Sequence, residues 1–116
     1  MITDRIRTWI GRDAWVKLTL YQDGELPLAG AITKAEFAFS SKDNSYCINT
    51  VDHPTMIFFE DASNQVLYLK LGLIEDLEPY SHYVGYLTIY DAESPIHGVP
   101  WGNPINVDVR EWHSCE

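Results

Sequence analysis

The chain has 116 residues, with 17 acidic and 8 basic side chains and a net charge of −9. This length fits one domain and leaves little room for a second. Hydrophobic residues make up 46% and aromatic residues 13%, which predicts a folded core and argues against disorder. The acidic balance argues against nucleic-acid binding, because neutralising phosphates requires clustered lysine and arginine. The small basic cluster Arg5, Arg7 and Arg12 has Asp4 and Asp13 beside it and is expected to be a solvated face.

The first residues do not resemble a secretory signal, since Asp4 falls where a positive region would be and no long apolar run follows. No window approaches the roughly 18 apolar residues that a membrane span requires. We therefore expect synthesis in a cytoplasm and no membrane partner. In that setting Cys47 and Cys115 are predicted to be free thiols, with a disulfide between them the less favoured alternative.

Residues 1–13 are predicted to form a short helical arm. Thr3 is a suitable cap and Gly11 a suitable end. Its three isoleucines, Ile2, Ile6 and Ile10, are spaced four apart, with Trp9 beside them. A helix this short is marginal alone, so it must pack on something. We expect it to cover one open end of the domain, or alternatively to dock on a neighbouring subunit.

The remaining chain carries strand signals at short intervals, separated by polar turns. In residues 16–21, for example, Val16, Leu18 and Leu20 alternate with polar or aromatic neighbours, which is the period of a half-buried strand. Strands are predicted at residues 14–21, 32–40, 46–51, 55–60, 65–72, 83–91 and 104–110.

Residues 73–82 do not fit the strand pattern. Ile74, Leu77 and Tyr80 lie three apart, which suits a helical turn or a compact loop that plugs the sandwich, and Pro79 limits any helix. The sequence as a whole predicts an all-β, immunoglobulin-like antiparallel β-sandwich of about seven strands over residues 14–112, followed by a C-terminal tail at 113–116.

Several segments, taken in order, have the character of a known module. They are the Asp23-Gly24 turn, the Leu26–Ala31 connector (LPLAGA), Glu36–Phe39 (EFAF), Asp61–Tyr68 (DASNQVLY), Glu75–Leu77 (EDL), Tyr83–Tyr86 (YVGY) and Ile105–Val109 (INVDV). On these segments, residues 14–110 resemble the small immunoglobulin-like modules of tailed-phage structural proteins, and in particular the N-terminal domain of phage baseplate upper proteins. One departure is Asn64-Gln65, where the family usually has a glycine; asparagine tolerates a left-handed turn, so the geometry can survive.

The resemblance implies a non-enzymatic structural or assembly protein of a tailed phage or prophage, in the head–tail connector, tail or baseplate region. It implies other virion proteins as partners, and a homo-oligomer is a further expectation. The implied location is the virion, after synthesis in the cytoplasm of the bacterial host. The family supplies no catalytic residue and no cofactor.

The residues themselves suggest no catalytic site. The four histidines do not share a metal-ligand spacing with one another or with cysteine: His53, His82, His97 and His113. No nucleophile motif is present. The acidic pairs Glu60-Asp61 and Glu75-Asp76 are interpreted as turn residues rather than as glycosidase carboxylates. Calcium binding through Asp43, Asn44 and Asp61 is conceivable, but the EF-hand spacing is missing. We predict no catalytic residue, no metal and no cofactor.

Aromatic residues are the remaining functional signal, because four tryptophans and seven tyrosines exceed what a small core needs. Trp101 is the best surface candidate, since a Pro-Gly loop is not expected to bury it. Tyr46 and Tyr68 are predicted to point outward. The predicted interface anchors are Trp9, Trp101 and Trp112, followed by Tyr86 and Tyr90. The alternative function is a carbohydrate-binding β-sandwich module, with Tyr86, Tyr90, Trp101, Asp91 and Asn103 around a sugar.

Overall fold

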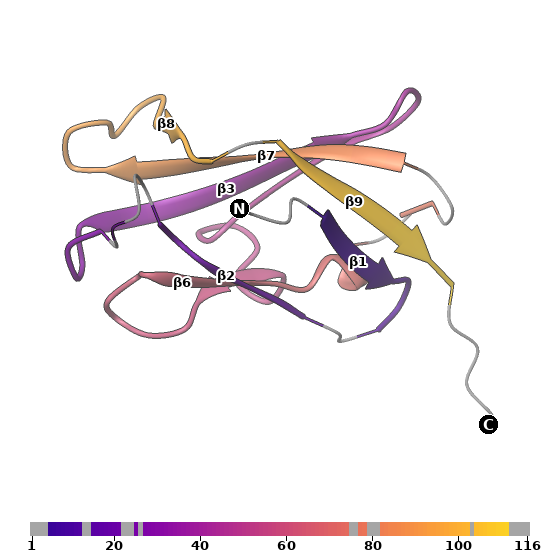
Figure 1. The fold of residues 1–116 in the computed structure, drawn as a ribbon, viewed down its shortest axis with the longest axis horizontal. Helices are drawn as coiled ribbons and strands as arrows, with labels where there is room; N and C mark the ends of the chain where they lie inside the picture. Colours follow the sequence, from indigo (N-terminus) through magenta and orange to yellow (C-terminus); the bar gives the residue numbers. More distant parts are fainter. Residues whose placement is uncertain are drawn as a thin grey trace.

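A computed structural model of the chain describes residues 5–12, 15–21, 25, 27–74, 77–78, 82–102 and 104–111. Within these ranges the protein is all-β, and its only helical element is a single 3-10 turn. Two sheets face each other as layers of a sandwich (Figure 1). The elements are β1 (Arg5–Trp9), β2 (Val16–Thr19), β3 (Ile32–Ser40), β4 (Ser45–Asn49), β5 (Ile57–Phe59), β6 (Val66–Leu69), η1 (Leu71–Leu73), β7 (His82–Asp91), β8 (Val99–Pro100) and β9 (Ile105–Arg110).

The larger sheet has six strands in the order β1-β9-β7-β3-β4, with β8 also paired to β7. The smaller sheet has three strands in the order β2-β6-β5. Every pair is antiparallel except β1 with β9, which is parallel. The long strands β3 and β7 run side by side through the larger sheet, whereas β2 and β6 lie in the opposite layer (Figure 1).

The core fills the space between the two sheets with apolar side chains at alternate strand positions. On β3, Ala35, Phe37 and Phe39 are at most 1% exposed. Leu67, Leu69 and Leu71 come from the other layer and are equally buried, as their alternation predicts. The resulting layer of branched and aromatic side chains holds the sheets together through apolar burial.

All seven predicted strands are found, with boundaries that shift by a few residues. The prediction for residues 32–40 matches β3 at both ends, and 83–91 differs from β7 by one residue at its start. The segment 55–60 shrinks to the three residues of β5. The short strand β8 is not predicted, because its two residues lie in a loop sequence with no alternating pattern.

The helix predicted over residues 1–13 is wrong for its described part. Residues 5–9 form β1 at the edge of the larger sheet. Ile6 and Thr8 are each 2% exposed, whereas Arg7 between them is exposed, which is the period of a strand. A spacing of four residues also returns a side chain to the same face of a strand, and β-branched residues favour extended backbone. β1 therefore belongs to the sandwich and is not a separate arm.

The connection from β6 to β7 contains η1, which begins inside the segment predicted as strand 65–72. Leu77 is 5% exposed and joins the core, as expected for a loop that plugs the sandwich. Pro79 and Tyr80 lie outside the described residues, as does the Asp23-Gly24 turn. Asn64 has a positive φ of 55°, so the left-handed conformation predicted for this position is confirmed.

Candidate interaction surfaces

The structure places Trp101 against the protein's own core. Its backbone N–H donates to the carbonyl of Leu87 at 2.9 Å, which continues the pairing of β8 with β7. The half-buried ring packs on the core cluster, and its Nε1 is buried without a hydrogen-bond partner among the described residues. The expectation that the domain could not bury this ring is wrong, because β8 draws the loop back onto the sheet. Trp101 is therefore a packing residue first.

Of the other two predicted tryptophans, Trp9 lies in the described part of the chain and offers little surface to a partner. Trp9 is half-buried at the end of β1, opposite Arg110 of β9. Two residues later, Gly11 donates its N–H to the carbonyl of Gly72 in η1 at 2.8 Å, so the turn after β1 is hydrogen-bonded to the rest of the domain. Trp112 lies outside the described residues.

Tyr86 and Tyr90 lie on the same outer face of β7 but differ in exposure. Tyr86 is 54% exposed, as expected of an interface residue, whereas Tyr90 is 8% exposed. Lys34 Nζ lies 4.2 Å from the Tyr90 ring centroid, and the phenol donates to Glu36 Oε2 at 3.5 Å. Burial, and then the Glu36 charge, raises the pKa of Tyr90. Tyr90 is therefore corrected from a surface anchor to a covered residue.

The sugar-binding set predicted around these tyrosines is not assembled as an exposed platform. Besides the covered Tyr90, Asp91 uses its Oδ1 to accept the backbone N–H groups of Glu93 and Ser94, at 3.0 and 2.8 Å. This carboxylate closes the turn after β7. Asn103 lies outside the described residues.

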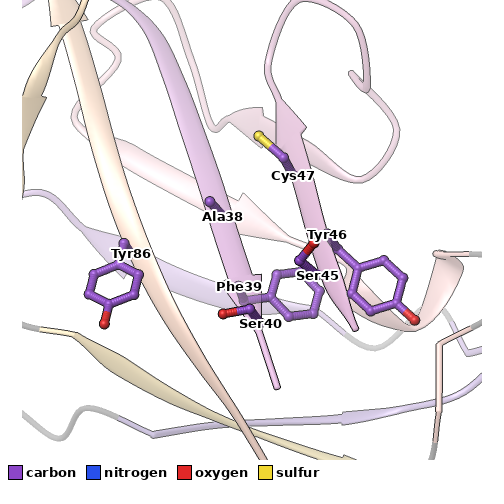
Figure 2. A pocket seen from close by; sticks show the side chains of 7 residues that line it. All are labelled: Ala38, Phe39, Ser40, Ser45, Tyr46, Cys47 and Tyr86. Atoms are coloured by element: carbon purple, nitrogen blue, oxygen red, sulfur yellow. The ribbon is translucent and has the colours of Figure 1, made fainter. Parts of the chain in front are cut away.

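Beside Tyr86, a shallow hollow of about 370 Å³ lies along β3 and β4. Small side chains line its floor, with Ala38, Ser40, Ser45 and Cys47 beside Tyr86 (Figure 2). Cys47 is an exposed free thiol; partial desolvation, and then the charge of Glu36, raises its pKa, which lowers the fraction present as the nucleophilic thiolate. Tyr46 points to the opposite side, where its ring stacks on Phe39 at 5.3 Å, so its predicted outward orientation is wrong.

A cluster of aromatic residues lies instead on the outer face of the smaller sheet. Pairing sets Lys17, Tyr68 and Phe58 in one row across β2, β6 and β5. Trp15, just before β2, is 56% exposed, and its ring meets Tyr68 edge-on at 5.0 Å. The Phe58 ring lies 5.4 Å from Tyr68. We call the set Trp15, Lys17, Phe58, Glu60, Tyr68 and Lys70 the aromatic face.

Charged side chains surround these rings. Lys70 Nζ lies 5.7 Å from the Phe58 ring centroid, and Lys17 Nζ lies 3.9 Å from Glu60 Oε1. The Tyr68 phenol donates to the same Glu60 oxygen at 3.4 Å. Two lysines thus accompany one carboxylate on a protein whose net charge is −9. The aromatic face is a locally basic, ring-lined surface, with a hollow of about 270 Å³ among Trp15, Phe58, Tyr68 and Lys70.

Sequence reasoning identified only part of the aromatic face. The outward orientation of Tyr68 is confirmed, but Trp15 and Phe58 were not among the predicted anchors. Strand alternation contains the missing signal: Ile57 is buried, so the next residue, Phe58, must face outward. A large ring at an outward strand position is the feature to look for. Only the pairing of three separate strands shows that the rings meet.

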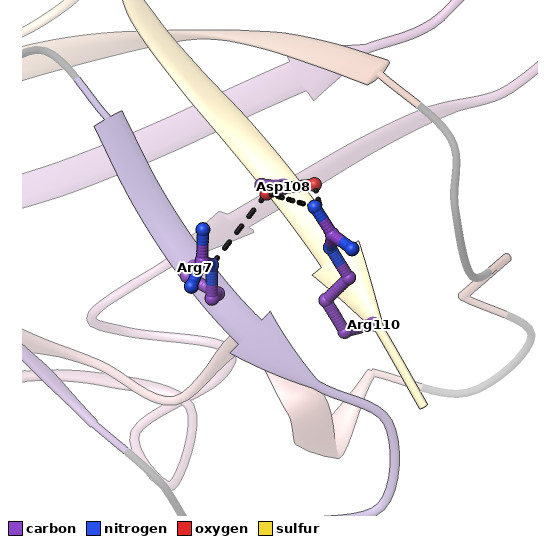
Figure 3. Close-up of polar contacts among 3 residues, drawn as sticks. All are labelled: Arg7, Asp108 and Arg110. Carbon is purple, nitrogen blue, oxygen red and sulfur yellow. Dashed lines mark hydrogen bonds and ion pairs between the residues drawn. The ribbon is translucent and has the colours of Figure 1, made fainter. Parts of the chain in front are cut away.

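A polar network lies along the β1 edge of the larger sheet, where Arg7 was predicted to be part of a solvated face. Asp108 on β9 receives hydrogen bonds from Arg110 at 3.1 and 3.2 Å (Figure 3). Arg7 Nε, on β1, lies 3.6 Å from the same carboxylate. Both arginine side chains are about half exposed, so the network contributes little to stability. It neutralises charge along the β1–β9 edge.

Within the described residues, no three His, Cys, Asp or Glu side chains come together as a metal site. No helix in the described part of the chain is long and apolar enough to span a bilayer. No protein-family model matches the chain, and no curated protein matches it in sequence.

Proposed function

We propose that this chain is a non-enzymatic structural protein of a tailed phage or prophage virion, in the head–tail connector, tail or baseplate region. In this role it is made in the cytoplasm of the bacterial host and acts through contacts with other virion proteins. The resemblance of residues 14–110 to phage modules is the reason for the virion assignment. The observation that carries the contact function is the aromatic face of the smaller sheet.

We further propose that the sandwich is immunoglobulin-like, and the strand order supports this. In such domains, strands B, E and D share one sheet, while C, F and G form the other, extended by C′ in variable-type domains. The order β2-β6-β5 corresponds to B-E-D, and β9-β7-β3-β4 corresponds to G-F-C-C′. β8 continues the line of β9 along β7.

The aromatic face has the composition of a protein-binding surface. Interfaces are enriched in tryptophan and tyrosine at their centres, and their energetic anchors are large rings surrounded by polar groups. Here Trp15 is the exposed ring, Tyr68 and Phe58 support it, and Lys17, Glu60 and Lys70 form the polar rim. An acidic patch on a partner would match the two lysines.

Purified virions test this function directly. Particles from the host strain that encodes the chain should contain it in a fixed copy number by quantitative mass spectrometry. Trp15→Ala should reduce incorporation at least tenfold, because removing an interface anchor costs about 2 kcal/mol or more. Leu28→Ala is the matched control, since Leu28 is 82% exposed on a different segment. Absence of the wild-type chain from the particles would refute the proposal.

The alternative is a carbohydrate-binding module, and the same exposed Trp15 ring favours it. Sugar sites combine aromatic rings with carboxylate, amide or hydroxyl groups, and Trp15 lies on the same sheet face as Glu60 and Tyr68. Titration of tryptophan fluorescence against a glycan panel separates the two functions. A saturable shift that disappears in Trp15→Phe would favour the sugar, and no shift at millimolar glycan would remove this alternative.

A further inference from the structure

β4 lies at the edge of the larger sheet, and its outward-facing backbone N–H and C=O groups can be identified residue by residue. Two bonds define which residues face β3: Ser41 N–H donates to Asn44 C=O at 2.7 Å, and Thr50 N–H donates to Ala35 C=O at 3.0 Å. In an antiparallel ladder, the bonded residues alternate. Even-numbered residues of β4 therefore bond to β3, and Ser45, Cys47 and Asn49 direct their N–H and C=O groups away from it.

The far end of this edge is already closed. The Asn49 N–H donates to His53 Nδ1 at 3.2 Å, and the Asn49 carbonyl accepts the His53 N–H at 2.9 Å. No hydrogen bond from the described residues occupies the outward backbone groups of Ser45 and Cys47. The open edge therefore consists of two donors and two acceptors on alternate residues.

The β4 edge also lacks the features that prevent an edge strand from pairing with another chain. Proteins protect exposed edges with charged side chains, proline or a covering loop. Among the described edge strands, β1 carries Arg7, β2 carries Lys17 and β8 ends in Pro100. On β5, the Ile57 N–H is taken by the His53 carbonyl at 3.1 Å. β4 has the sequence SYCIN, without a charge or a proline.

We propose that two copies of this chain associate edge to edge through antiparallel pairing of β4. The open groups are self-complementary when Ser45 lies opposite Cys47 of the second copy, and Cys47 opposite its Ser45. Each such pair exchanges both N–H···O bonds, so every open group on both edges is satisfied. The two-fold axis then passes beside Tyr46, which faces its own counterpart.

The side chains on both faces of the joined sheet are compatible with this register. On the inner face, Tyr46 of each copy occupies a non-hydrogen-bonded position, where opposite side chains approach most closely and aromatic pairs stabilise the sheet. On the outer face, only the small Ser45 and Cys47 side chains meet at the seam (Figure 2). The pairing does not require a disulfide, because the two Cys47 residues are not opposite each other.

The contact is small, so it belongs to the weak class of interfaces. Two copies of net charge −9 repel, and screening this repulsion with salt should strengthen the dimer. Edge pairing through β4 does not depend on the proposed virion role, because it involves a different surface and its test uses the isolated protein.

Solution mass and amide exchange test the pairing together. Under reducing conditions and 0.5 M salt, light scattering up to about millimolar protein should show the 13.3 kDa monomer approaching twice its mass. Cys47→Pro removes one open donor and should remain monomeric, whereas Cys47→Ser should dimerise like the wild type. In the wild type, the Ser45 and Cys47 amides should gain protection from hydrogen exchange with concentration, while the already bonded Asn49 amide should not change.

Each readout can overturn the proposal independently. A wild-type protein that stays monomeric at millimolar concentration would refute it. So would a dimer whose Ser45 and Cys47 amides still exchange rapidly, because that dimer would use another surface. The exchange measurement needs no variant, so a folding defect in Cys47→Pro would not rescue the inference.

Discussion

The buried hydroxyl of Thr8 leads to a prediction that tests the unexpected strand β1. Thr8 is 2% exposed, and its Oγ1 has no hydrogen-bond partner among the described residues. Leaving a buried hydroxyl unpaired costs about 1–3 kcal/mol in proteins. Valine has nearly the same shape and an equal preference for strands. Thr8→Val should therefore stabilise the protein by about 1–2 kcal/mol, even though most substitutions destabilise.

Urea unfolding followed by circular dichroism measures this change, and thermal unfolding provides a second estimate. For a chain of this length, each kcal/mol should raise the melting temperature by about 4 °C. Thr19→Val is the matched control, because Thr19 lies on β2 with its side chain exposed. Its effect should stay within about 0.5 kcal/mol.

A destabilised Thr8→Val protein would contradict the assignment of Thr8 to the buried face of β1. Equal effects at both positions would contradict it too, because Thr8 in the helical arm predicted from the sequence would then, like the exposed Thr19, have no buried, unpaired hydroxyl. The comparison therefore distinguishes a strand from a helix without a new structure.

Three further predictions concern single contacts. Gly85→Ala should destabilise the protein by about 1–3 kcal/mol in urea, since its new methyl would collide with the Phe37 ring, and Phe37→Leu in the same chain should recover part of the loss. In a Cys115→Ser background, iodoacetamide should alkylate Cys47 more slowly at pH 8 than a peptide cysteine, and Glu36→Gln should accelerate it by lowering the raised pKa; equal rates would show that the thiol is not perturbed. The pKa of Asp61 is lowered by hydrogen bonds from Ser63, so its contribution to stability is present above the unfolded pKa of about 4 and lost as pH falls through the folded value. Carboxyl titration by NMR should show a higher Asp61 pKa in Ser63→Ala, and an unchanged pKa would assign the shift to another group.

The core strands could be predicted because one face of each is buried. Alternation of Ala35, Phe37 and Phe39 with polar residues fixes both the element and its inward face, and the structure confirms this for β3. The same reasoning failed for residues 5–9, because an isoleucine spacing of four fits a strand and a helix equally. The parallel partner β9 lies about a hundred residues away in the sequence, so local pattern could not decide between them.

The surface was harder to predict than the core. Exposure of Tyr86 is confirmed, but Tyr90, on the same face, is covered by Lys34 and Glu36, which reach it from β3. Trp101 is drawn inward by a two-residue strand that has no sequence signature. Whether a ring is exposed depends on which strand becomes its neighbour, and single-strand periodicity does not contain that information.

The most direct test of the contact function is photo-cross-linking from the aromatic face inside assembled virions. A photoreactive benzophenone amino acid would replace Trp15, with Leu28 replaced in the same way as the control, since both side chains are largely exposed. We expect position 15 to form one dominant cross-link to another virion protein and position 28 to form none. Equal labelling at both positions, or no cross-link from position 15 in particles that contain the chain, would contradict it.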